Sequence, residues 1–316
     1  MKINKLSLII LSLALVVSLT VCASHPNKEE DSDTGTTTSG EACQLAYQEI
    51  VAIPSPSSAT FAGEKVPLEN FDVDESLSRE LTSIVYGHGT LVHTIRLSSR
   101  FFPVIEPILK EQGIPDDFKY LCVAESNLQN VVSPAKAAGY WQFLAGTAKE
   151  FGLEVNADID ERYNIEKATV AACKYFKQAY AKYGSWTLAA ASYNVGMSHI
   201  NGQIERQKTD SYYDMSLNLE TARYVYRAIA YKEIMSNPAA YGFNISQETM
   251  FRPLEYKEVQ VKTDITNLAD FAIKNGTNYK MLKVFNPWLR SAQLTNKSKK
   301  TYTIKIPKEG FRDGSC

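Results

Sequence analysis

The sequence predicts a mainly helical protein whose C-terminal end carries a small α+β domain. From about residue 66, apolar side chains recur at the spacing that places them on one face of each helix. Strand-like alternation of apolar and polar residues is nearly absent before residue 250 and occurs twice after it. With 316 residues, 44% of them hydrophobic, the chain can form one large or two modest domains with real cores.

Residues 1–23 are interpreted as a signal segment. Lys2 and Lys5 give it a positive start, and the apolar run that follows is too short for a comfortable membrane span. The run ends at Val21-Cys22, which resembles a bacterial lipoprotein box with Cys22 as the lipidated residue, although Val21 departs from the usual small residue. The alternative is simple cleavage after Ala23. Both interpretations export the protein.

Residues 24–65 are expected to form a flexible linker. Residues 25–41 are almost entirely polar and cannot bury enough surface to fold. Pro54 and Pro56 stiffen the part that follows. A lipid anchor followed by a linker suits an enzyme that must reach a substrate away from its membrane.

Residues 66–240 are expected to form an all-helical domain. Asp74 opens its first helix, Ser185 caps a later one, and glycines such as Gly113 and Gly184 end others. Pro103 is expected to separate two helices. The expected helices cover residues 74–86, 90–102, 104–112, 147–151, 165–183 and 186–191, and a further helix opens at residues 115–117 and carries Glu125 near its end.

Residues 250–310 are expected to form the small α+β domain. The pattern indicates a strand at 259–261, helices at 265–274 and 279–285, and a second strand at 301–306. The order is therefore strand, helix, helix, strand.

Composition excludes some classes of function. A net charge of -1 gives no reason to expect nucleic acid as a partner. None of the four His residues stands with Cys or carboxylates at a zinc-ligand spacing, so no metal is expected. Cys122 and Cys173 lie in apolar helical segments and are expected to be buried thiols.

Glu125 is the candidate catalytic residue. It lies within an apolar run near a helix end, where burial should raise its pKa and let it act as a general acid. A turn-rich link with Ser133 leads to Gly139 and then to an aromatic and amide cluster that includes Gln142. Such a cluster suits a sugar ring with an N-acetyl group. The alternative is a solvated or salt-bridged glutamate beside core aromatics.

Four motifs follow one another along the chain. They are Glu125-Ser126; Ser133-Pro134 with Gln142 after Gly139-Tyr140-Trp141; Tyr193-Asn194-Val195-Gly196; and Glu220-Thr221 with Tyr224-Val225. In this order they resemble the motifs of the lytic transglycosylases with a goose-lysozyme-like SLT catalytic domain. The flanking residues 114–117 are most similar to the membrane-bound transglycosylase D type. In the third motif Ser192 and Val195 replace the usual Ala residues.

The resemblance implies a lysozyme-like fold and cleavage of peptidoglycan between N-acetylmuramic acid and N-acetylglucosamine, with formation of a 1,6-anhydro end. Glu125 would act first as acid and then as base, and no cofactor would be needed. Tyr193 would hydrogen-bond Glu125, and Asn194 would support the site. Ser133 and Gln142 would contact sugar groups. Glu220 would line the groove, and Ser126 would bind substrate or only a local backbone group.

Two rival functions remain open at this stage. A lysozyme-type hydrolase on the same fold would use water in place of the C6 hydroxyl. An inactive scaffold that only binds peptidoglycan is a different class, and an intact Glu125 with all four motifs argues against it.

Residues 250–310 resemble a degenerate LysM domain, a glycan-binding module. Asn286-Pro287 and the strand ending at Pro307 match its pattern, whereas Thr263-Asp264 replaces the usual Gly-Asp. The alternative is a small packing domain. Together the resemblances imply a monomeric enzyme that acts on glycan strands in the periplasm of a Gram-negative bacterium, anchored to the membrane through lipidated Cys22.

Overall fold

The computed structural model describes residues 51–312, which belong to one compact unit. The predicted signal segment, Cys22 and most of the predicted linker lie outside the described residues. The helices are α1 (Phe71–Val85), α2 (His88–Glu111), α3 (Lys119–Ser126), α4 (Ala145–Glu150), α5 (Ile165–Tyr183), α6 (Trp186–Val195), α7 (Met197–Gln207), α8 (Leu219–Ser236), α9 (Leu268–Lys274) and α10 (Tyr279–Phe285). Short 3-10 turns are η1 (Asp116–Phe118), η2 (Glu161–Tyr163), η3 (Tyr212–Asp214), η4 (Pro238–Tyr241) and η5 (Gln247–Thr249).

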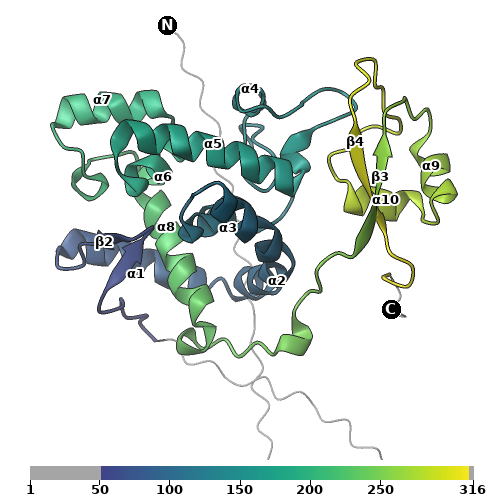
Figure 1. Ribbon diagram of the computed structural model, residues 1–316. Helices are drawn as coiled ribbons and strands as arrows, with labels where there is room; N and C mark the ends of the chain where they lie inside the picture. The colour runs from purple at the N-terminus through teal and green to yellow at the C-terminus, as the bar shows by residue number, and fades with distance from the viewer. Residues whose placement is uncertain (1–50, 313–316) are drawn as a thin grey trace, which may run out of the picture. The chain divides into compact units, whose positions relative to one another are not determined.

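The helical domain is built around α3 and α8. Helix α8 packs against α1, α3 and α6, and α2 packs against α3 and α5, so that α3 lies among longer helices (Figure 1). Leu121, Cys122 and Val123 of α3 are fully buried. A short helix enclosed in this way holds its side chains in fixed positions, which suits a site that needs one group oriented accurately.

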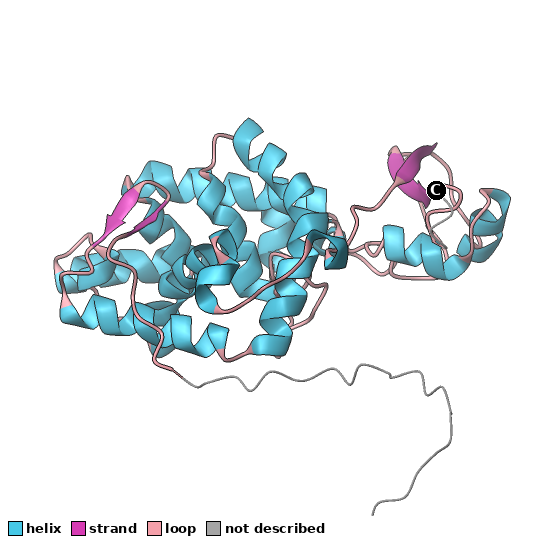
Figure 2. Ribbon diagram, turned by 90° about the horizontal axis from the view of Figure 1, so that it is seen from below, coloured by secondary structure: helices cyan, strands magenta, loops and turns pink. Residues whose placement is uncertain are grey.

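The two-stranded hairpin of β1 (Ala59–Phe61) and β2 (Glu64–Val66) was not expected from the sequence. Ala59 pairs with Val66, and Phe61 is fully buried against Phe118, with ring centroids 5.4 Å apart. Figure 2 shows this hairpin beside the helices of the described residues, apart from the strands of the C-terminal region. Part of the predicted 24–65 linker is therefore folded. The strands have three residues each, too few to show alternation in the sequence.

Helix α2 runs through Pro103 and Pro107, so the prediction of two helices separated at Pro103 was wrong. Both prolines lie on the exposed side of the helix. Leu97, Ile105 and Leu109 are buried on the other side, before and after the prolines. Burial of one continuous apolar face outweighs the lost backbone hydrogen bonds.

The strand, helix, helix, strand order predicted for the C-terminal region is confirmed. Strand β3 (Tyr256–Val261) pairs antiparallel with β4 (Tyr302–Pro307), with Val259 opposite Ile304. Asn267 and Asn278 cap α9 and α10 through their side chains. The predicted fold class, a helical domain followed by a small α+β domain, is thus the observed one.

Other local predictions also hold. The Ser185 side chain accepts a hydrogen bond from the backbone of Leu188, and Gly184 ends α5 in the left-handed conformation. Cys122 and Cys173 are free and fully buried.

Candidate active site

Glu125 lies at the last turn of α3, immediately before the chain turns sharply. Asn127 and Leu128 both have positive φ angles, 51° and 59°, which side chains other than Gly adopt at a cost. Leu128 is buried, and Asn127 accepts a hydrogen bond of 2.8 Å from the hydroxyl of Tyr231 on α8. These contacts stabilise the turn and fix the position at which α3 presents Glu125.

The carboxylate of Glu125 is bound by Tyr224, not by Tyr193. The Tyr224 hydroxyl donates a hydrogen bond of 2.5 Å to Oε1 of Glu125. The predicted bond from Tyr193 to Glu125 was therefore wrong, because the Tyr193 hydroxyl donates instead to the backbone carbonyl of Trp141 at 2.7 Å. Tyr193 holds the wall of the site, and Tyr224 holds the acid.

The sequence contained a signal for the contact made by Tyr224. Tyr224 follows Thr221 by three residues on α8, so both side chains lie on one helix face. Thr221 donates to the side chain of Asn194 at 2.8 Å, and Asn194 belongs to the third motif. The face that carries Thr221 is therefore the face directed at the site.

The environment raises the pKa of Glu125 from its ordinary value of 4.5 to about 7. Desolvation by burial is the main cause; the bond from Tyr224 and the positive charge of Arg227 oppose it, and the negative charge of Glu220 adds to it. A carboxyl with this pKa is protonated in a large fraction of molecules near neutral pH. It can donate a proton and, once ionised, accept one.

A cavity of about 270 Å³ opens beside Glu125. Of the described residues that line it, Glu125 is the one carboxylate. The lining residues are Glu125, Ser133, Ala135, Ala137, Gln142, Phe143, Leu144, Thr147, Tyr175, Tyr193 and Asn194. The fold thus brings five of the predicted site residues to one cavity from three separate parts of the chain.

Ser133 and Gln142 lie on a tightly bonded loop of residues 131–143, which we call the groove loop. The Ser133 backbone N–H donates to the carbonyl of Ala137 at 2.9 Å, and the Ser133 hydroxyl accepts from the Ala137 N–H at 3.1 Å. Nε2 of Gln142 donates to the carbonyls of Gly139, at 2.7 Å, and Val131, at 3.0 Å. These bonds fix both side chains relative to the cavity.

Two predicted site residues do not line the cavity. Ser126 is buried, and its hydroxyl donates to the backbone carbonyls of Tyr140, at 2.7 Å, and Cys122, at 3.2 Å, which matches the alternative of a local backbone role. Glu220 is exposed and accepts a bond of 2.9 Å from Arg227. This bond holds the pKa of Glu220 below its ordinary value, so Glu220 is not a second proton donor.

Two protein-family models match parts of this chain. A family model described as the transglycosylase SLT domain matches residues 103–216. The chain contains an SLT domain. A second model, described as the soluble lytic transglycosylase C-terminal LysM-like domain, matches residues 257–310. The matched SLT residues include Glu125 and the groove loop, whereas α8, which supplies Tyr224, follows them.

The chain is also similar to curated proteins named membrane-bound lytic murein transglycosylase D. Those of Escherichia coli strain K12 and of Escherichia coli O6:H1 strain CFT073 are each 25% identical to it over 243 residues. The match covers 74% of this chain and 52% of each relative. The chain thus spans about half the length of the curated relatives that it matches.

Among residues 51–312, no group of three or more His, Cys, Asp and Glu side chains is arranged to hold a metal ion. No helix in the same range is long and apolar enough to cross a membrane.

Proposed function

We propose that this protein is a lytic transglycosylase that cleaves the β-1,4 bond between N-acetylmuramic acid and N-acetylglucosamine in peptidoglycan without water. The observation that carries the proposal is Glu125, a single carboxyl with a pKa of about 7 beside a cavity lined by Ser133, Gln142, Tyr193 and Asn194. Hydrolases that use two carboxylates place them on either side of the bond. A mechanism in which one group acts twice fits the residues that line this cavity better.

In the first step Glu125 protonates the glycosidic oxygen. Because Tyr224 donates to Oε1, the acidic proton is carried by Oε2. The bond to the anomeric carbon breaks, its electron pair stays with the departing oxygen, and the N-acetyl group of the substrate stabilises the positive charge left on the carbon. Glu125 is now ionised, and the hydrogen bond from Tyr224 strengthens because its acceptor carries a full charge.

In the second step ionised Glu125 takes the proton of the C6 hydroxyl of the same sugar. The C6 oxygen then bonds to the anomeric carbon and closes the 1,6-anhydro ring. The nucleophile is part of the bound substrate, so the step benefits from proximity. Glu125 returns to its protonated form, and the reaction consumes neither water nor a cofactor.

The other site residues bind and orient the glycan. Ser133 and Gln142 on the groove loop contact N-acetyl or hydroxyl groups. Tyr193 keeps the backbone of Trp141 in place, and Asn194 joins the end of α6 to α8 through Thr221. Glu220 acts on the charge of the site from outside the cavity, both directly on Glu125 and through its bond with Arg227.

The N-terminal sequence is the basis for the proposed location of the enzyme. Residues 1–23 direct export, and Cys22 carries a lipid that anchors the protein to a membrane facing the periplasm. The protein acts as a monomer on glycan strands, which its SLT and LysM-like domains both contact.

Mass spectrometry of digested peptidoglycan tests the proposal. We expect products lighter by one water molecule than those of a hydrolase, and none from Glu125→Gln, whose amide neither donates nor accepts the required proton. Loss of turnover should be about a thousandfold or more. Reducing-end products would identify a hydrolase instead. Binding of the polymer without cleavage by the wild type would identify a scaffold, and full activity of Glu125→Gln would refute the assignment of the acid.

A further inference from the structure

Residues 154–163 join the SLT domain to the LysM-like domain through their backbone. The N–H of Asp160 donates to the carbonyl of Trp288 at 2.9 Å, and the N–H of Arg290 donates to the carbonyl of Asp158 at 2.7 Å. Between these bonds, Ile159 and Leu289 form an antiparallel bridge, and both are fully buried. We call residues 154–163 the junction segment.

Side chains reinforce the backbone contacts of the junction segment. The carboxylate of Glu154 accepts bonds from the Tyr302 hydroxyl, at 3.1 Å, and the Lys300 ammonium, at 3.0 Å. The guanidinium of Arg290 lies 4.0 Å from the ring centroid of Tyr163. A cation above an aromatic face is attracted by the electrons of the ring, so this contact is favourable as well as close.

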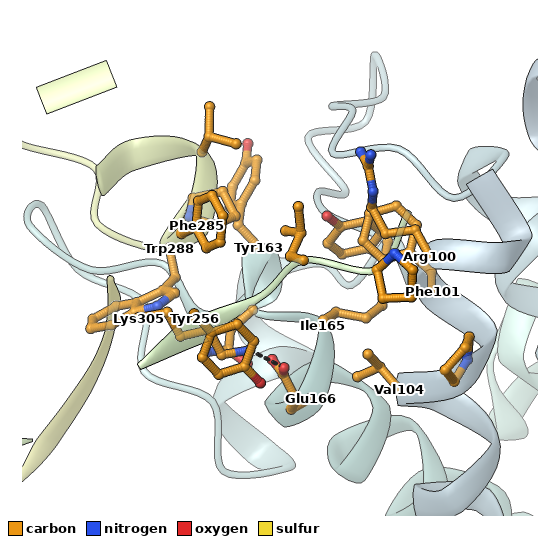
Figure 3. A pocket seen from close by; sticks show the side chains of 17 residues that line it. Arg100, Phe101, Val104, Tyr163, Ile165, Glu166, Tyr256, Phe285, Trp288 and Lys305 are labelled. Carbon is orange, nitrogen blue, oxygen red and sulfur yellow. Dashed lines mark hydrogen bonds and ion pairs between the residues drawn. The ribbon is translucent and has the colours of Figure 1, made fainter. Parts of the chain in front are cut away.

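The apolar core of the LysM-like domain extends into the SLT domain. Ala138 of the groove loop, Ile159 and Tyr163 belong to the same buried cluster as Trp288 and Leu289. Figure 3 shows the neighbouring pocket, where Tyr163 and Ile165 lie near the aromatic rings of the LysM-like domain and Glu166 forms an ion pair with Lys305. The two domains therefore share a core at this junction.

The segment between α8 and β3, which connects the two domains, is also fixed to the SLT domain. Phe251 donates its N–H to the carbonyl of Arg96 at 3.2 Å and accepts at its own carbonyl from the Ser99 hydroxyl at 2.8 Å. The guanidinium of Arg96 lies 4.1 Å from the Phe251 ring centroid. With the junction segment, this gives the LysM-like domain two separate attachments.

Arg162 connects the junction segment to the active site. One of its terminal nitrogens donates to the backbone carbonyls of Lys136, at 3.1 Å, and Phe143, at 3.0 Å. These carbonyls lie on the two sides of the groove loop that carries Ser133 and Gln142. Asp160 holds the guanidinium at 2.7 Å, and about a tenth of each side chain is exposed.

The groove loop also touches the backbone of Arg162 directly. Gly139 has a φ of +81°, and a Cβ atom at this position would lie 1.9 Å from the carbonyl oxygen of Arg162. Only Gly allows this approach. The groove loop is therefore fixed both to the side chain and to the main chain of Arg162. The ion-pair partner of Arg162, Asp160, donates its backbone N–H to Trp288 of the LysM-like domain.

We infer that Arg162 is a positioning residue for the substrate groove, and that the docked LysM-like domain keeps it in place through the junction segment. The inference rests on the proposed function, because it assigns the groove loop to glycan binding. The LysM-like domain is then part of the catalytic unit, in addition to any glycan that it binds. A loop displaced by about 1 Å can lower the rate a hundredfold.

The test compares full-length variants. Arg162→Lys keeps a cation beside Asp160 but cannot reproduce the bonds to both loop carbonyls, so we expect turnover of peptidoglycan to fall about tenfold or more at an unchanged pH optimum. Hydrogen exchange of amides in residues 131–143 should become faster, while exchange in α5 stays as in the wild type. Arg206→Lys, on the exposed face of α7, is the matched control and should change neither readout.

A second variant tests the role of the LysM-like domain. Arg290→Ala combined with Tyr302→Phe removes two contacts with the junction segment, those to Tyr163 and Glu154. The double variant keeps an aromatic ring at position 302 and therefore preserves the apolar packing there. We expect faster exchange in residues 131–143 again, with turnover lowered about twofold to fivefold. Unchanged exchange there in this variant would overturn the role of the LysM-like domain.

Two results with Arg162→Lys would overturn its positioning role. One is turnover and loop exchange equal to the wild type, and the other is faster exchange throughout the SLT domain, which would indicate a general effect on folding. Exchange does not depend on turnover. If the wild type released no anhydro products, the proposed function would fail while the exchange experiment still decided whether Arg162 and the junction segment fix the loop.

Discussion

Glu80 and Glu125 both contact α8, and their partners on that helix differ in charge. Glu80, on α1, is fully buried and lies 2.6 Å from Nε of Arg223 and 3.6 Å from Nε of Arg227. Glu125 receives a neutral donor, the Tyr224 hydroxyl. Glu80 therefore has positive charges that compensate its own, and Glu125 has one hydrogen bond and a pKa of about 7.

The comparison shows how one helix can serve structure and chemistry with adjacent residues. Arg223 and Arg227 occupy one face of α8 and join it to α1 through Glu80. Tyr224 lies one position along, so its side chain points about a quarter turn away, toward Glu125. A buried carboxyl that lacks a cationic partner keeps its proton to a higher pH, which is what a general acid requires.

The largest expected difference between the two carboxylates is in stability. Because the folded-state pKa of Glu125 lies above the ordinary 4.5, the folded protein binds this proton more tightly than the unfolded chain. That stabilisation is present below pH 4.5 and is lost as the pH rises to about 7. Glu125→Gln cannot ionise, so at pH 8 we expect it to be more stable than the wild type by up to about 3 kcal/mol.

Urea unfolding across pH 4 to 8 measures this effect, with Glu80→Gln as the matched control. Replacement of Glu80 leaves Arg223 without its nearest anion, so this variant should be less stable than the wild type by about 2 kcal/mol, a reduced value because both arginines reach solvent. If Glu125→Gln and Glu80→Gln changed the free energy of unfolding in the same direction at pH 8, the proposed difference between the two carboxylates would be wrong.

A smaller effect is expected from removal of the neutral donor. Tyr224→Phe takes away the bond that orients Glu125 and lowers its pKa. Turnover should fall about tenfold to a hundredfold, as expected for a hydrogen bond to a charged group, and the basic limb of the pH–rate profile should move to higher pH. Tyr193→Phe is the control, because Tyr193 bonds a backbone carbonyl. A shift of the limb with Tyr193→Phe but not with Tyr224→Phe would reverse the two assignments.

The smallest expected effect concerns the charge outside the cavity. Glu220 raises the pKa of Glu125 and also pairs with Arg227, which lowers it. In Glu220→Gln the negative charge that raises the pKa of Glu125 is absent, and Arg227, which lowers that pKa, is no longer paired with a carboxylate. The basic limb of the pH–rate profile should therefore move to lower pH by roughly a few tenths of a unit. Glu205→Gln, at an exposed position on α7, should leave it unchanged. A move to higher pH would show that Glu220 does not act through charge.

The sequence predicted those parts of the fold that are determined by residues close to one another in the chain. Helix α5 begins and ends at the predicted residues, because Asn164 caps one end and Gly184 terminates the other. The C-terminal strands and helices were found because each has a clear period. The hairpin at residues 59–66 and the continuous α2 were missed, since both depend on burial against distant residues such as Phe118.

The motifs predicted which residues lie close together more accurately than which contacts they make. Glu125, Ser133, Gln142 and Asn194 line one cavity. Which tyrosine reaches Glu125 depends on how α6 and α8 pack, and no local pattern contains that information. Arg162 carried no signal either, because its partners are backbone carbonyls, which are the same for every residue type.

The close approach of Gly139 to Arg162 has a genetic consequence. Gly139 has no side chain that could bind or react, yet the smallest possible addition would overlap a backbone oxygen. In a library with every substitution at every position, selected for cell-wall cleavage, position 139 should be as intolerant as position 125. Intolerance at position 125 would reflect the loss of a proton donor. Intolerance at position 139 would reflect the absence of room for a single methyl group.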